Sequence, residues 1–388
     1  VLNGTNYCFR NNAGGTAADM YKESTSGWVK QDLGETMYFT SGGATEIAEG
    51  DTITGDTSTE TATVKRVIVT SGAWADGDAA GRLILYSVSG AFTPGEGLEV
   101  IAVNVATCTA DSAANTLAPD GRFQVVVENF GGHSGTIAAY GCDGVSLGWE
   151  WDGLVFTPII TGMTIDTPIR VFVHKKHLFF AFTGGSVQHS GIGTPYIWSV
   201  ITGAGEIALG TEITGFLHNT TNALSAALTI FGRNKIAVLY GSSSVDWELV
   251  DLSDEAGAIA WSPQLIGKAT YVDDRGIRTL ETARAYGDFS LGTLSNTVKP
   301  IFDSNKKAGV TIKASLRVKA KDLYRIYWSD GTGLTMYLGR KYPELMAFDY
   351  GMVVHAVWSG EDSSGNEIMF FGSTDGYVYQ IDAGTSFD

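Results

Sequence analysis

The feature that most constrains the fold is a hairpin-like unit that recurs along the chain at a nearly constant interval. Each unit has a short hydrophobic or alternating run, a tight turn, a second run, and then an acidic residue or a glycine. Repeats of about 40–50 residues are typical of the blades of β-propellers. Successive turns are 41, 49, 41, 56 and 45 residues apart and fall near Asp143, Gly184, Arg233, Asp274, Asp330 and Asp375.

The N-terminal segment sets the expected number of blades. Residues 6–29 supply one more candidate hairpin, so the sequence predicts a six- or seven-bladed propeller. No WD, kelch or YWTD signature marks the turns, and the period therefore indicates an architecture and not a family. An array of β-sandwiches is the alternative, although sandwiches favour turn signals every ~8–12 residues without this longer period.

The composition agrees with an all-β chain. The sequence has 49 Gly but only 8 Pro, together with 18 Phe and 16 Tyr, which suits many short strands joined by tight turns. Residues 222–228 are the one segment that we interpret as a possible short helix.

Residues 42–115 interrupt the period and are expected to form an inserted module, a small β-barrel or sandwich. Two arms within them, Glu49–Val64 and Pro94–Ala110, resemble each other and indicate a rough internal twofold character. Residues 1–41 and 116–388 then form the propeller. The predicted core of the insert consists of Ile53, Val64, Val67, Leu83, Leu85, Leu98 and Val100.

The charge of the chain argues against nucleic-acid binding. The net charge is −16, and the insert contributes −7 from ten acids and three bases. Such a surface repels phosphate backbones, although a conduit through which DNA slides without sticking benefits from this sign. The cysteines are odd in number, and no two of them have a CxxC spacing, which indicates free thiols. No signal peptide or membrane-spanning run is present. Because the chain begins at Val1, we expect it to be trimmed or processed at one or both ends.

The sequence contains no constellation that predicts catalysis, and we expect no catalytic, cofactor-binding or metal-ligating residues and no enzyme activity. His174 and His177 have a spacing that a metal site could use, but they sit where a solvated turn is expected. The Asp-rich turns lack the spacing of calcium loops and are interpreted as hairpin turns. Glu150 and Asp152 could serve a glycosidase, yet they also suit a strand with one packed and one wet face.

A basic row gives the only candidate interface. Lys313, Arg317, Lys319 and Lys321 alternate with apolar residues between Ile312 and Ala320, which predicts a strand with an apolar inner face and a basic outer face. In an acidic protein this row is a possible contact with a neighbouring subunit or an acidic partner, and an ordinary solvated face is the alternative.

Several segments resemble virion proteins of tailed bacteriophages. The longest is Phe231–Phe302, and the phrase GDTITGDTSTETATV in the insert, Asp152–Phe182 and Tyr379–Asp388 are also similar to these proteins. The group that we can name is the β-propeller tail nozzle or hub proteins of short-tailed phages, which stabilise packaged DNA. The resemblance covers most of residues 120–388 and part of the insert, and it includes no catalytic motif.

The resemblance implies a structural component of the phage tail in the virion. It would form a ring, expected to be sixfold, which contacts portal and adaptor proteins and tail fibres or spikes. DNA would pass through it without specific binding, and no cofactor is implied. The main alternative is a non-catalytic receptor- or glycan-binding tail protein that uses exposed Trp residues as sugar platforms, and a weaker one is a secreted glycan-cleaving propeller.

Overall fold

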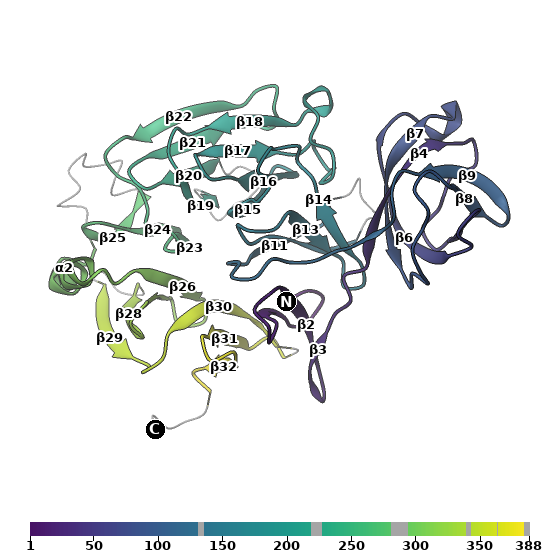
Figure 1. The fold of residues 1–388 in the computed structure, drawn as a ribbon. Coiled ribbons are helices and arrows are strands. Elements are labelled where there is room, and N and C mark those ends of the chain that lie inside the picture. Colours follow the sequence, from purple (N-terminus) through teal and green to yellow (C-terminus); the bar gives the residue numbers. More distant parts are fainter. Residues whose placement is uncertain (131–135, 219–226, 281–293, 339–342, 363, 384–388) are drawn as a thin grey trace. The chain divides into compact units, whose positions relative to one another are not determined.

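The computed structural model describes residues 1–130, 136–218, 227–280, 294–338, 343–362 and 364–383. It is an all-β protein with a seven-bladed β-propeller arrangement and a closed six-stranded barrel (Figure 1). Residues 222–226 of the predicted short helix lie outside the described residues, and β20 begins at Leu228.

The seven blades are antiparallel sheets of three or four strands each, numbered here in chain order. Blade 1 is β1 (Tyr7–Asn11), β2 (Ala18–Ser24) and β3 (Gly27–Lys30). Blade 2 is β11 (Gln124–Glu128), β12 (Ala138–Cys142), β13 (Gly148–Trp151) and β14 (Phe156–Ile159). Blade 3 is β15 (Arg170–His174), β16 (His177–Ala181), β17 (Ser186–His189) and β18 (Gly205–Ala208). Blade 4 is β19 (Ile213–His218), β20 (Leu228–Gly232), β21 (Ile236–Tyr240) and β22 (Glu248–Ser253).

The remaining blades complete the set. Blade 5 is β23 (Gln264–Ile266), β24 (Lys268–Asp273) and β25 (Gly276–Thr279). Blade 6 is β26 (Ile312–Val318), β27 (Leu323–Trp328), β28 (Thr332–Tyr337) and β29 (Glu344–Asp349). Blade 7 is β30 (Val354–Glu361), β31 (Glu367–Ser373) and β32 (Val378–Ile381). Short 3₁₀ turns occur at η1 (Trp74–Asp76), η2 (Val200–Thr202) and η3 (Asn296–Val298), and helix α2 (Lys299–Ala308) precedes blade 6.

The predicted turn period is confirmed. All six predicted turns connect the second and third strands of a blade, and the N-terminal hairpin candidate is blade 1. The Asp residues have a local reason for their place in these turns. In four of the Asp-rich turns the Asp carboxylate accepts a hydrogen bond from the backbone N–H of the residue two positions later in the chain. These Asp residues are Asp273, Asp330, Asp362 and Asp375. This is the Asx-turn, which mimics a backbone turn and needs no metal.

The chain divides into two compact units. Unit 1 contains residues 1–180 and 189–205, and unit 2 contains residues 181–188 and 206–388. In unit 1 a cluster that includes Met20, Trp149 and Phe156 packs blade 1 against blade 2. In unit 2, separate clusters pack blade 4 with blade 5, blade 5 with blade 6, and blade 6 with blade 7. Both faces of an inner blade are therefore covered, and aromatic and branched residues fill the spaces between the sheets.

The barrel is one sheet closed on itself. Its strands are β4 (Glu35–Gly42), β5 (Thr52–Gly55), β6 (Thr61–Ser71), β7 (Ala79–Tyr86), β8 (Gly97–Val100) and β9 (Val103–Cys108), and the short β10 (Ala113–Ala114) pairs with β4. The order β4-β7-β6-β5-β8-β9 closes because β9 also pairs with β4. Five of the predicted core residues are fully buried and Val67 and Val100 are half-buried against them, so the predicted core is confirmed.

The hydrogen bonds show the internal twofold character of the barrel. Gly50 donates to Val64 as Gly95 donates to Cys108, and Val64 donates to Asp51 as Cys108 donates to Glu96. The two acids also cap equivalent turns, because Asp51 accepts from the N–H of Ala48 and Glu96 from that of Thr93. The strands β4, β5 and β6 thus correspond to β7, β8 and β9.

The barrel begins at Glu35 with β4, seven residues before the boundary at residue 42 that the sequence predicts. Strand β4 is the cause, because its alternating residues Met37 and Phe39 point into the barrel core while Tyr38 is exposed. That strand looks like one more propeller strand in the sequence, and its pairing with β7 and β9 is long-range. No helix in the described part of the chain combines the length and the apolar character that a membrane crossing requires.

We expect a chain from which residues 35–114 are deleted to fold as a propeller. The ends to be joined are adjacent, because Asn115 donates a backbone hydrogen bond to Gly34. The deletion variant also carries Glu150→Gln, because the deletion removes Arg66 of the barrel, which pairs with the Glu150 carboxylate. Circular dichroism and gel filtration of the deletion, and of residues 35–114 alone, test the prediction. Insoluble or unfolded protein from both pieces would show that barrel and propeller form one folding unit.

Candidate functional site

The predicted basic row is not a single surface. Lys313 and Arg317 are half-buried on β26, whereas Lys319 and Lys321 are exposed in the turn that follows it. The apolar half of the prediction is correct for the strand, because Ile312, Ala314, Leu316 and Val318 are buried. It is wrong for Ala320, which is exposed in the turn. The expected wet outer face is wrong for the strand itself.

The reason lies in the place of β26 in its blade. It is the first strand of blade 6, and it contacts both β23 of blade 5 and β30 of blade 7. Ser315, which should face solvent, is buried and donates from Oγ to the carbonyl oxygen of Trp261 at 2.6 Å. Gln264 of blade 5 donates to the carbonyl oxygen of Ser315 at 3.1 Å. The neighbouring blades therefore cover most of β26 and leave Lys313 and Arg317 only partly exposed.

The exposed end of the row is held by blade 7. The backbone N–H groups of Lys319 and Ala320 donate to the carboxylate of Glu367. Lys321 pairs with Asp382 at 3.2 Å, and Arg325 pairs with the same carboxylate at 2.8 Å. These contacts give the turn a structural role within unit 2.

A buried ion cluster joins the barrel to blade 2 in unit 1. The Nη2 atom of Arg66 in β6 lies 2.7 Å from Asp152 and 3.4 Å from Glu150, and its Nη1 atom lies 3.2 Å from Glu49. The Arg66 side chain is 4% exposed and that of Glu150 is 0% exposed. Asp152 also accepts the backbone N–H groups of Leu154 and Val155, so the turn after β13 orients it.

Two tyrosines extend this junction. Burial, and then the neighbouring Glu150 carboxylate, raise the pKa of Tyr196 well above its ordinary value. The Tyr86 hydroxyl in β7 accepts from the N–H of Phe156 and donates to the carbonyl oxygen of Asp32. Burial raises the pKa of Tyr86 to about 12. Both phenols are therefore neutral hydrogen-bonding groups at physiological pH.

The cluster pairs Glu150 and Asp152 with Arg66, an arrangement that the sequence does not indicate. The expected strand with one wet face is wrong, because Gly148–Trp151 are buried throughout. Burial lowers the pKa of Arg66, yet the surrounding acids and Tyr196 outweigh this effect and raise it. A buried ion pair adds little net stability over an apolar contact, but removal of one partner costs about 3–5 kcal/mol.

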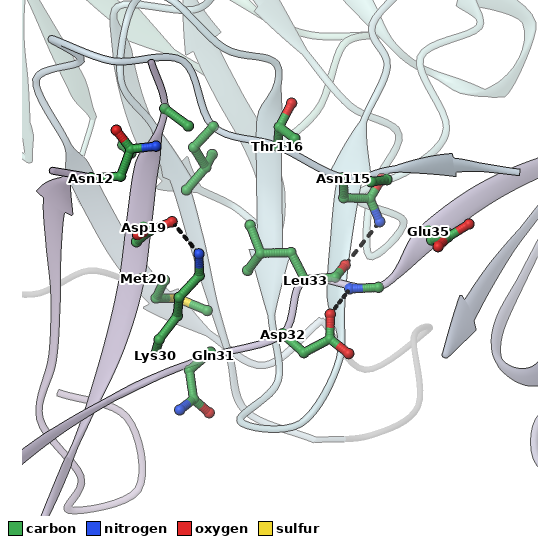
Figure 2. A pocket seen from close by; sticks show the side chains of 15 residues that line it. Asn12, Asp19, Met20, Lys30, Gln31, Asp32, Leu33, Glu35, Asn115 and Thr116 are labelled. Carbon is green, nitrogen blue, oxygen red and sulfur yellow. Dashed lines mark hydrogen bonds and ion pairs between the residues drawn. The ribbon is translucent and has the colours of Figure 1, made fainter. Parts of the chain in front are cut away.

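A pocket of mixed polar and apolar lining lies beside the two linkers that connect the barrel to the propeller, one from blade 1 and one to blade 2. Its volume is about 300 Å³. The outgoing linker contributes Lys30–Glu35, the returning one Ala114–Leu117, and β2 the wall (Figure 2). Lys30 pairs with Asp19 at 2.8 Å, Asp32 accepts from the N–H of Gly34, and Asn115 donates to the carbonyl oxygen of Leu33. These bonds fix the conformation of both linkers, so we assign the residues that line the pocket a structural role at the connection between barrel and propeller.

The two histidines of HKKH are buried, and the prediction of a solvated turn is correct only for the lysines between them. Lys175 and Lys176 make the turn with positive φ angles of 48° and 61°. His177 lies with Nδ1 2.6 Å from the carbonyl oxygen of Ser190, and its ring centroid lies 5.4 Å from that of His189. Burial lowers the pKa of His177, and it lowers that of His189 to about 4. Among the described residues, no group of three or more His, Cys, Asp or Glu side chains is placed to hold a metal ion.

Comparisons with known proteins found similarity among solved structures at low TM-scores. No protein-family model matches the chain, and no curated protein matches it. The crystal structure of a mitotic checkpoint complex is similar at 11% identity and a TM-score of 0.40, over 89% of this chain and 93% of that one. The C-terminal WD40 domain of Sif2 is similar at 13% identity and a TM-score of 0.41, over 94% and 89%. A BBS1N–ARL6DN complex has 13% identity and a TM-score of 0.35, over 66% and 89%. These likenesses carry no functional argument, and the blade count rests on the strand pairing.

We expect Arg66→Met to destabilise unit 1 by about 3–5 kcal/mol, because it leaves buried Glu150 without its cation. Arg66→Met combined with Glu150→Gln should cost clearly less than Arg66→Met alone. Lys65→Met is the matched control, since Lys65 is an exposed neighbour on the same strand. Urea unfolding followed by tryptophan fluorescence measures the differences. Equal effects of Arg66→Met and Lys65→Met would contradict a stabilising cluster.

Stability is expected to fall between pH 7 and pH 5 because of the histidine pair. An unfolded histidine takes up a proton near pH 6.5, whereas the folded pKa of His189 is about 4. The contribution is therefore complete above pH 6.5 and is lost as the pH falls below it. His189→Gln should flatten the pH dependence of the urea midpoint in this window. An unchanged slope in the variant would exclude this pair as its source.

Proposed function

We propose that this chain is a structural subunit of a tailed-bacteriophage virion. It forms a ring-shaped nozzle or hub in the tail, which helps to retain packaged DNA and provides the conduit for its ejection. Its partners are other copies of itself, portal and adaptor proteins, and tail fibres or spikes. The sequence resemblance of Phe231–Phe302 and the shorter segments supports the virion assignment.

The observation that carries the proposal is the surface charge of the barrel. Residues 42–115 have six exposed carboxylates, on Glu46, Glu49, Asp56, Asp76, Asp78 and Asp111, and of these Glu49 pairs with Arg66. Lys65 is the one exposed cation among them, because Arg66 and Arg82 are both buried. The fold thus withdraws the two arginines from solvent and leaves an acidic surface.

An acidic surface suits a DNA conduit for a physical reason. Each contact between a cation and a phosphate releases counterions and adds affinity with a log–log salt slope of about −0.9. A ring repeats every such contact in each subunit, so even weak contacts would slow the passage of DNA. Six copies of this chain would carry a formal charge of −96, which opposes such contacts at short range.

The glycan-binding alternative receives less support. Such sites need aromatic side chains that stack on sugar rings from the surface. Of the nine tryptophans, all of which lie in the described residues, Trp28 in β3 is the one exposed side chain. Trp149 and Trp151, which flank Glu150 in the sequence, are fully buried in the core between blades 1 and 2. The engagement of Glu150 and Asp152 by Arg66 favours a non-catalytic role as well.

The purified full chain tests this proposal. We expect native mass spectrometry and negative-stain microscopy to show a closed ring with a central channel. We also expect no binding of a 30-base-pair duplex at 20 μM protein in 150 mM NaCl. A chain that stays monomeric at this concentration and binds a glycan array would favour the alternative. Micromolar duplex binding would contradict a non-adhesive conduit.

A further inference from the structure

A cationic patch lies on unit 2, where the turns of two blades meet helix α2. Asp274, in the turn between β24 and β25, pairs with Arg233 of the blade 4 turn at 2.6 Å and with Lys306 of α2 at 3.1 Å. One carboxylate thus holds cations from two other elements side by side. We define the cationic patch by the cations Arg233, Arg275, Lys299, Lys306 and Lys307 and the acids Asp274 and Asp303.

Helix α2 presents its lysines to solvent because its other face is packed. Phe302 is buried in the cluster between blades 5 and 6, with Ile301 and Val298 half-buried beside it. Lys306 and Lys307 occupy the last turn, where cations favour the helix dipole. Lys299 pairs with Asp303 along the helix. The five cations and two acids of this definition sum to +3, in a chain whose total is −16, and the patch is bordered by Asp251 and Asp254, which pair with Lys235 in the same turn as Arg233.

The barrel has an end of the opposite sign. Gly42 at the end of β4 pairs with Ala79 at the start of β7, so the segments next to both residues share one end of the barrel. Three exposed acids, Glu46, Asp76 and Asp78, lie on these segments. We call this the acidic end of the barrel.

We propose that the acidic end of the barrel of one copy binds the cationic patch of a second copy. The inference rests on the proposed ring, for which it names the contact between subunits. The two surfaces have opposite sign, whereas whole chains of charge −16 repel one another, so local complementarity is needed to orient their approach. Two different surfaces make a heterologous contact, which generates a ring when the rotation closes.

Charge reversal tests the contact. We expect Lys306→Glu with Lys307→Glu to weaken self-association at least about tenfold at 100 mM NaCl, measured by sedimentation velocity and native mass spectrometry. Glu46→Lys with Asp76→Lys should do the same. A chain that carries all four changes should regain association to within about threefold of the original. Arg10→Glu with Lys65→Glu is the control pair, with the same change in charge at exposed positions outside both surfaces.

The salt dependence of the unchanged protein gives a second measurement that needs no variant. Association through these surfaces should weaken at least about tenfold between 50 and 500 mM NaCl. Circular dichroism melting curves confirm that each variant folds.

The outcomes separate this inference from the proposed function. An unchanged protein that never assembles refutes the ring, and the contact with it. A protein that assembles, but whose two reversals change association by less than threefold, refutes the contact alone. The contact is also overturned if only the control pair disrupts assembly, or if the patch variant loses duplex DNA binding while its assembly is unchanged.

Discussion

The buried guanidinium group of Arg66 is the interaction that holds the barrel against blade 2. Two linkers connect the barrel to the propeller, and linkers alone would allow it to swing. Arg66 crosses that gap, because it leaves the barrel wall and ends between Glu150 and Asp152 of blade 2. Arg66 and Glu150 are both buried, so separation of barrel and blade leaves these charges without their partners at a cost of several kcal/mol. The barrel is therefore a fixed arm of unit 1, held also by Tyr86 and by the hydrogen-bonded linkers.

The same burial shapes the surface charge. An arginine on the outside of the barrel would offset part of its acidity and offer a contact for phosphate. Arg66 and Arg82 are instead both buried, and Lys65 is the cation that stays exposed between residues 42 and 115. The structural role of the junction and the acidic character of the barrel surface thus have a common origin. One chain thus carries two surfaces of opposite charge, the acidic end of the barrel in unit 1 and the cationic patch in unit 2.

Local patterns made much of this fold predictable. The turns recur because each blade needs its central hairpin, and Asp or Gly supplies the turn geometry at that point. The core of the barrel was predictable from its apolar residues between turn signals, such as Ile53, Val64, Leu83 and Leu85. Long-range pairing was not predictable in the same way. Strand β4 resembles a propeller strand until its partners β7 and β9 are known, and Lys313 resembles a solvated residue until blade 5 covers Ser315 beside it. Arg66 and Glu150 are 84 residues apart, and an isolated Arg in an alternating strand gives no signal of its partner.

The rigidity of the barrel on blade 2 is the central claim, and a distance distribution between them measures it directly. Spin labels at Val103→Cys on β9 and Val145→Cys in the β12–β13 turn, both at exposed positions, report on the two parts. Cys8→Ser removes the one native cysteine that is not buried. Double electron–electron resonance should give a single narrow distance distribution, which broadens when Arg66→Met is added. A broad or bimodal distribution with Arg66 in place would contradict a fixed arm.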